Sequence, residues 1–322
     1  MVVLERSEKM IKEINYDKDT RTTHKAPEVK KYGACSPFVE MMPFVFKGKL
    51  MRFEHVPAEK LGKLPFKHDK ACEIVRDVES GKVISLTLDN VLFASGYVEG
   101  DKAYCLGVDA DDRTKIMISE SCDLVNWSTR TLLTNPDCCF FNTSLTKGPD
   151  GYVLALETNK PEEYVGVPFT ALFATSKDMV NWTFMSYDKM FPTQRYLGGP
   201  YLKYVDGWYY LISVTELPCY RFTNYIYRTR DFETWYDGLY NPMFMFDNND
   251  RKLSGHAVDF DEEDIKNIEY AGVVSSISDI DMCDYNGKVY INYLIGNQLG
   301  FCYMAEATYD GTVEEYLKSF FE

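Results

Sequence analysis

The amino-acid sequence predicts an all-β protein folded as a five-bladed β-propeller, and two repeated patterns carry this prediction. The first pattern is a short polar segment in which a tryptophan follows an aspartate by four residues. The tryptophans are 55 and 53 residues apart, in the segments Ser121–Trp127, Ser176–Trp182 and Thr229–Trp235. A period near fifty residues is typical of one supersecondary unit per repeat, as in propeller blades.

The second pattern is an apolar run, a tight turn and another apolar run. It occurs around five glycines: Gly48, Gly100, Gly151, Gly207 and Gly287. Runs rich in Val, Ile, Tyr and Leu that are joined by Asp-Gly or Asn-Gly are strong signals for β-hairpins. Five such hairpins predict five blades within residues 37–322.

Residues 1–36 are charge-rich and only weakly periodic, so they do not fit a blade. We expect them to form an N-terminal arm along the rim of the propeller. The alternative is that the arm supplies the closing strand of a blade, because ring closure removes the free edges of the sheets.

Two short helices are expected outside the hairpins. The interval before the last hairpin is long, and Phe260–Tyr270 is predicted to be an inserted helix opened by Asp259. Thr312 and Glu315 have the spacing of a capping box, which predicts a short C-terminal helix.

The composition excludes several functional classes. The formal net charge of −14 argues against a nucleic-acid partner, because phosphate binding needs a basic surface. No apolar run approaches the ~18–20 residues that a membrane span needs, so no membrane association is expected. The four histidines lack metal-binding spacing, and neither a metal nor another cofactor is expected.

The nine cysteines are an odd number and are scattered without C-x-x-C pairs. This pattern predicts reduced thiols in a reducing compartment. Because the sequence shows no export signal, we expect a cytoplasmic protein. The oligomeric state is left open.

With these motifs, the chain resembles the five-bladed β-propeller glycosidases, in particular glycoside hydrolase family 43. The resemblance covers roughly residues 37–310 and rests on the tryptophan segments, the hairpin period and Gly199–Tyr210. This last segment is similar to the innermost hairpin of a family 43 blade. The resemblance implies a carbohydrate substrate and, by analogy, hydrolysis with inversion.

The chain departs from the family at the catalytic positions. Family 43 enzymes carry two aspartates and a general-acid glutamate, and the matching positions resemble Glu40, Asn142 and Gly198. Asn142 cannot ionise, and Gly198 has no side chain. The resemblance therefore implies either a branch with relocated carboxylates or a non-catalytic relative.

Strand direction provides an independent set of candidate catalytic residues. In a propeller, the first strand of each hairpin begins on the face where the second strand ends, and binding residues gather in the loops of such a face. Glu40 and Asp279 lie eight residues before their turn glycines, and Glu157 and Glu216 end second strands. Glycoside hydrolysis needs a protonated and an ionised carboxyl group. We predict Glu157 or Glu216 as the acid, and Glu40 or Asp279 as the base or nucleophile.

Other polar and aromatic residues are predicted to bind substrate or to tune these carboxyl groups: Arg52, Asn142, Tyr201, Asp281, Asn297 and Gln298. Each tryptophan segment contains an aspartate at the same position, namely Asp123, Asp178 and Asp231, so these residues are interpreted as turn formers.

The predicted function is hydrolysis of a terminal sugar or short oligosaccharide. Two alternatives stay open: a glycoside phosphorylase, which would need a cationic cluster, and a catalytically silent carbohydrate-binding propeller.

Overall fold

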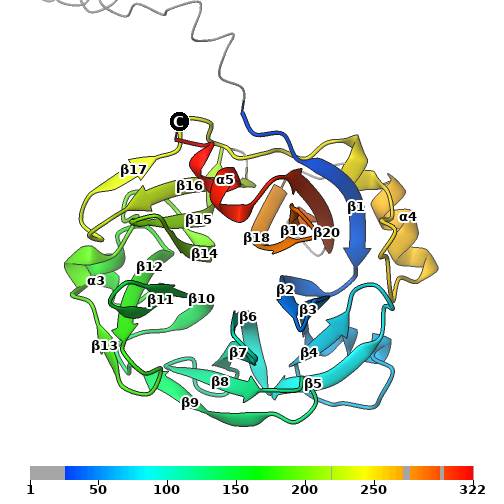
Figure 1. Ribbon diagram of the computed structural model, residues 1–322, viewed down its shortest axis with the longest axis horizontal. Coiled ribbons are helices and arrows are strands. Elements are labelled where there is room, and N and C mark those ends of the chain that lie inside the picture. Colours follow the sequence, from blue (N-terminus) through cyan, green and yellow to red (C-terminus); the bar gives the residue numbers. More distant parts are fainter. Residues whose placement is uncertain (1–25, 219, 271–275, 298–300, 322) are drawn as a thin grey trace, which may run out of the picture.

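The computed structural model describes residues 26–218, 220–270, 276–297 and 301–321. Five antiparallel four-stranded sheets are arranged as blades around a common axis (Figure 1). The predicted five-bladed β-propeller is therefore confirmed. All five predicted hairpins are present, and each supplies the two innermost strands of its blade.

Blades one to four each use four consecutive strands, ordered from the axis outward. Blade one contains β2 (Val39–Phe46), β3 (Lys49–Val56), β4 (Cys72–Asp77) and β5 (Val83–Asp89). Blade two contains β6 (Val91–Glu99), β7 (Lys102–Asp109), β8 (Lys115–Ser121) and β9 (Ser128–Thr134). Blade three contains β10 (Phe140–Gly148), β11 (Gly151–Thr158), β12 (Thr170–Ser176) and β13 (Trp182–Phe184). Blade four contains β14 (Gly198–Val205), β15 (Trp208–Leu217), β16 (Arg221–Thr229) and β17 (Trp235–Asp237).

Blade five joins the two ends of the chain. Its inner strands are β18 (Ser276–Tyr285), β19 (Lys288–Gly296) and β20 (Cys302–Asp310), and its outermost strand is β1 (Lys30–Ser36). β1 runs antiparallel to β20, with Lys30 opposite Thr308. Part of the expected arm therefore forms the closing strand of the ring, while residues 1–25 lie outside the described part of the chain.

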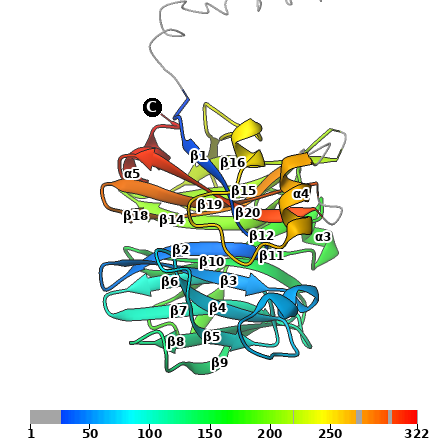
Figure 2. The same cartoon turned by 90° about the vertical axis from the view of Figure 1, so that its right-hand side faces the viewer.

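The short helices lie in the connections: η1 (Ala58–Lys63), α3 (Glu162–Val165), η2 (Tyr187–Lys189), η3 (Asn248–Arg251), α4 (Glu262–Tyr270) and α5 (Val313–Lys318). α4 lies at the rim of the ring (Figures 1 and 2). The inserted helix is thus confirmed, but Asp259 does not open it. The carboxylate of Asp261 caps it by accepting the N–H groups of Glu263 and Asp264 at 3.0 and 2.9 Å. Asp259 instead pairs with Arg76.

The C-terminal helix α5 begins with the predicted capping box of Thr312 and Glu315. Its buried residues Tyr316 and Leu317 pack into the core of blades four and five. β20 ends near the hairpin turns, since Asp310 lies opposite Lys288, so α5 lies on the face of the hairpin turns. The other face, where the inner strands begin and the second strands end, is called the mouth below.

The three repeated aspartates form the turns predicted for them. Each carboxylate accepts the backbone N–H groups two and three residues later, at 2.9 and 2.8 Å, in the segments of Asp123, Asp178 and Asp231. These hydrogen bonds lower the pKa of each aspartate. The eight cysteines in the described ranges form no disulfide, and no helix in these ranges is long and apolar enough to cross a membrane.

Candidate active site

Every innermost strand has a bulge close to the mouth. The pairing with the second strand is interrupted after Val39, Leu92, Phe140, Gly198 and Ser278. In four blades, the first residue of the bulge has a positive φ: 49° at Glu40, 52° at Phe93, 47° at Gly199 and 48° at Asp279. Bulges re-aim side chains and are frequent beside active sites. Here the same irregularity recurs around the whole mouth.

Four carboxyl groups meet within this ring of bulges. Glu40 comes from β2, Glu157 from the end of β11, and Asp279 and Asp281 from β18. Burial raises the pKa of all four groups, and the carboxylates of Asp279, Glu157 and Asp281 raise that of Glu40 further. No lysine, arginine or histidine is among the groups that shift these four pKa values in the described residues. The environment of the cluster therefore favours the protonated, neutral forms of these carboxyl groups.

Glu157 is 3% exposed and is held by two neutral donors. Its Oε2 atom accepts the side-chain amide of Asn142 and the backbone N–H of Gly199, both at 2.9 Å. Burial raises the pKa of Glu157 to about 7, although these hydrogen bonds act in the opposite direction. A carboxyl group with this pKa is protonated in about half of the molecules at neutral pH, as a general acid requires.

Asp279 lies on the other side of the same glycine. A Cβ atom placed on Gly199 would lie 2.1 Å from Asp279 Oδ1, so the absence of a side chain allows the carboxylate to approach the backbone. Burial raises the pKa of Asp279, and the neighbouring Ser278 hydroxyl partly offsets that rise. Glu157 and Asp279, from blades three and five, thus both contact the bulge of blade four.

Glu40 and Asp281 complete the cluster. Glu40 Oε2 is buried and has no hydrogen-bond partner in the described residues. The pKa of Asp281 is raised well above its ordinary value, by burial and by the charge of Asp279. Both environments favour the neutral, protonated form of these side chains.

Glu216, the second candidate acid, has a different environment. It ends β15 as predicted, but its side chain is exposed. Its charge contributes to a raised pKa of Tyr196, which places it near the mouth. Glu216 is not among the main groups that shift the pKa values of Glu40, Glu157, Asp279 and Asp281.

Arg52 does not join the carboxyl cluster. Its side chain is completely buried beside Glu54, with Nε 2.8 Å from Glu54 Oε1. Arg76 donates to the same carboxylate at 2.9 Å. Because residues 52 and 54 of a strand project to the same side, this pair forms its own buried charge network, next to Glu306 and Tyr290 of blade five.

The remaining predicted binding residues are placed as follows. Tyr201 is 5% exposed and packs in the apolar core of blades four and five, and its pKa is raised by burial and by the charge of Asp281. Asn297 folds back onto its own loop, and its Oδ1 accepts the N–H of Phe301 at 3.2 Å. Gln298 lies outside the described residues. Of the predicted binding residues in the described ranges, Asp281 belongs to the carboxyl cluster, Asn142 donates to Glu157, and Tyr201 lies near Asp281.

Two features near the mouth were missed by the sequence analysis. Glu73 of β4 is buried next to Glu40, and its Oε1 is 3.1 Å from Nδ1 of His55. Tyr196, in the β13–β14 connection, has a pKa raised by burial and by Glu157 and Asp279. Neither residue lies at a hairpin end, so strand counting could not find them.

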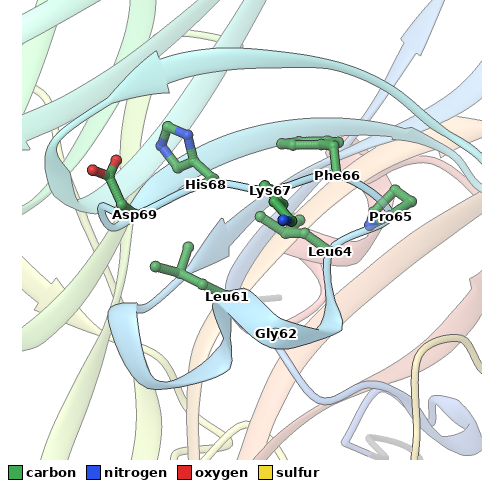
Figure 3. A pocket seen from close by; sticks show the side chains of 8 residues that line it. All are labelled: Leu61, Gly62, Leu64, Pro65, Phe66, Lys67, His68 and Asp69. Carbon is green, nitrogen blue, oxygen red and sulfur yellow. The ribbon is translucent and has the colours of Figure 1, made fainter.

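A separate hollow lies in the β3–β4 connection of blade one (Figure 3). Its lining comes from one stretch of chain: Leu61, Gly62, Leu64, Pro65, Phe66, Lys67, His68 and Asp69. His68 pairs with Asp89 at 2.9 Å. Because none of these residues belongs to the carboxyl cluster, the hollow is not part of the candidate site.

Comparisons with known proteins agree with the fold. No family model and no curated protein sequence matches the chain. A solved structure described as "Glycoside hydrolase" is 12% identical with a TM-score of 0.61, over 91% of this chain and 95% of that chain. The α-L-arabinofuranosidase Arb93A from Fusarium graminearum, bound to an iminosugar inhibitor, is 10% identical with a TM-score of 0.56, over 89% and 98%.

The GH43 protein BlXynB from Bacillus licheniformis is likewise 10% identical, with a TM-score of 0.54 over 88% of this chain and 53% of that chain. At such low identities, these likenesses establish the fold alone. The resemblance to the propeller glycosidases is therefore confirmed at the level of the fold.

Proposed function

We propose that this protein is a glycoside hydrolase that releases a terminal sugar or short oligosaccharide at the mouth of the propeller. One observation carries the proposal: Glu157 and Asp279 contact the same glycine from two blades, and the pKa of Glu157 is about 7. Glycoside hydrolysis needs such a pair, one group protonated and the other ionised. The glycosidase fold of the structural neighbours supports the same reaction class.

In the proposed reaction, Glu157 is the general acid. Its proton passes to the glycosidic oxygen as the bond from that oxygen to the anomeric carbon breaks. Residue 198 has no side chain at the position where the family resemblance implies the acid, and Glu157 reaches the adjacent Gly199 from blade three. The carboxylate would thus be relocated to a neighbouring strand.

Asp279 is the proposed base. It accepts a proton from the water that attacks the anomeric carbon, and the leaving group departs from the opposite side, giving inversion as the family 43 resemblance implies. Asp279 suits this role better than Glu40, because three neighbouring carboxylates favour the protonated form of Glu40. Glu40 and Asp281 would then donate hydrogen bonds to sugar hydroxyl groups.

The test is a panel of 4-nitrophenyl glycosides of pentoses and hexoses in both anomeric forms, assayed with and without phosphate. The proposal predicts nitrophenol release from at least one member at a rate independent of phosphate. Release that requires phosphate and yields a sugar 1-phosphate would instead establish a phosphorylase. Sugar binding by calorimetry without turnover of any member would establish a silent binding propeller.

A further inference from the structure

Six aromatic side chains form a continuous row along the mouth, from blade two to blade four. Neighbouring ring centroids are 5.8, 4.4, 5.6, 5.6 and 5.0 Å apart. In order, the members of this aromatic row are Phe93, Phe141, Phe169, Tyr196, Phe222 and Tyr220. Phe93 and Phe141 lie in the inner strands β6 and β10, and Phe222 lies in β16. Phe169, Tyr196 and Tyr220 lie in connections between strands. The fold therefore assembles the row from separate parts of the chain.

Five of the six rings in the aromatic row lie outside the hydrophobic core, and the sixth, Phe222, is 6% exposed. Phe93, Phe141, Phe169 and Tyr196 are partly exposed, and Tyr220 is 51% exposed. In the described part of the chain, none of these five rings packs into the buried apolar clusters of the blades. A contiguous apolar surface of this kind on a soluble fold indicates a binding site.

One end of the aromatic row is held rigidly. The guanidinium group of Arg113 stacks on Phe141, 3.6 Å from the ring centroid, and lies 5.6 Å from Phe93. Its Nε and Nη2 atoms donate to the carbonyl oxygen of Phe140 at 3.1 and 3.0 Å. These contacts fix the ring positions before a ligand arrives, which lowers the entropic cost of binding.

The aromatic row passes beside the proposed acid. Phe141 precedes Asn142, whose amide binds Glu157, and the hydroxyl of Tyr196 lies against Gly198. The charges of Glu157 and Asp279 both act on Tyr196. The other carboxyl groups of the cluster come from blades one and five, outside the span of the row.

We propose that the aromatic row binds the leaving-group side of an oligosaccharide, by stacking against the apolar faces of the sugar ring that follows the scissile bond. A general acid must lie beside the glycosidic oxygen, which stays with the leaving group. Because Glu157 lies beside the aromatic row, the leaving group lies over the row. The sugar on the other side of the scissile bond then lies toward blades one and five. The proposal rests on the proposed function, because the side of the leaving group is defined by the acid.

The test compares two substrates that contain the same sugar, chosen as the one that the parent protein hydrolyses. The 4-nitrophenyl glycoside has a ring as its leaving group, whereas the glycosyl fluoride has a single atom. We expect Phe169→Ala to lower kcat/KM for the 4-nitrophenyl glycoside about tenfold more than for the fluoride, mainly through KM. Phe169→Leu, which keeps apolar bulk without the ring, should show the same selectivity if Phe169→Ala does not fold. Phe66→Ala, in the separate hollow of blade one, is the matched control and should show no selectivity.

Equal losses on both substrates, or no loss on either, would overturn the assignment of the aromatic row while leaving the hydrolase intact. Failure of the parent protein to hydrolyse any fluoride or 4-nitrophenyl glycoside would instead overturn the proposed function. The two outcomes are therefore distinguishable in one series of measurements.

Discussion

Gly199 is the residue on which the proposed site depends most, because both proposed catalytic carboxyl groups contact it. Its N–H donates to Glu157, and the space where a Cβ would lie is occupied by the carboxylate of Asp279. Its φ of +47° is shared by Glu40, Phe93 and Asp279 at the equivalent bulges, so the backbone conformation alone does not require glycine. The contact with Asp279 is the constraint that selects glycine at this bulge.

We expect Gly199→Ala to displace Asp279 and to lower kcat/KM by about a hundredfold or more, as for loss of a general base. Gly207→Ala is the matched control, since Gly207 lies in the same hairpin with a φ of +82° and open space around its Cα. That variant should lose about 1 kcal/mol of unfolding free energy and keep its activity. Equal activities of the two variants would show that the contact with Asp279 is unimportant.

At the scale of elements, the ring depends on a strand from the opposite end of the chain. β1 provides the outer edge of blade five, and Ala34 exchanges hydrogen bonds with Lys252 and Ser254 at 2.8 Å. Cys35 and Ala34 are completely buried. The strand therefore closes the ring and also anchors the long connection that carries α4.

We expect a variant that lacks residues 1–36 to lose cooperative unfolding, because blade five would be left with an open edge and an uncovered core. A variant that lacks residues 1–25 keeps β1 and serves as the control. Urea titrations followed by tryptophan fluorescence would measure both transitions. A cooperative transition of parental midpoint in the shorter protein would contradict the role assigned to β1.

Whether an element depends on local or distant contacts explains which features could be predicted from the sequence. Hairpin turns and Asx turns are local, so five blades and the roles of Asp123, Asp178 and Asp231 follow from short motifs. Strand counting selected Glu40, Glu157 and Asp279, which the structure brings together, because their positions depend on the same local register. It could not place Arg52, since β3 also carries Glu54 as a nearby buried partner, and it could not find Tyr196, whose connection has no periodic signal.

At the scale of the whole molecule, the buried carboxyl groups make stability depend on pH. Folding raises the pKa values of Glu40, Glu157, Asp279 and Asp281, so the folded protein binds more protons than the unfolded chain. Their full stability contribution is present below the unfolded pKa values and is lost as the pH rises through the folded ones. The free energy of unfolding should therefore be lower at pH 8 than at pH 5.

Glu157→Gln tests this linkage, because glutamine keeps an acceptor for Asn142 and Gly199 but carries no charge. A shift from 4.5 to about 7 corresponds to about 3 kcal/mol, so the variant should exceed the parent in unfolding free energy by up to that amount at pH 8. At pH 5 the difference should be small. Urea unfolding at both pH values measures it, and a variant less stable than the parent at pH 8 would contradict the raised pKa.

The role of Glu157 as the general acid is tested most directly by the dependence of Glu157→Gln activity on the leaving group. A 2,4-dinitrophenolate departs with little help from an acid, whereas a methyl glycoside needs protonation of its oxygen. We expect kcat/KM of Glu157→Gln to fall about a hundredfold or more on the methyl glycoside and much less on the 2,4-dinitrophenyl glycoside of the same sugar. Equal losses on both substrates, or parental activity on the methyl glycoside, would contradict the assignment of Glu157 as the general acid.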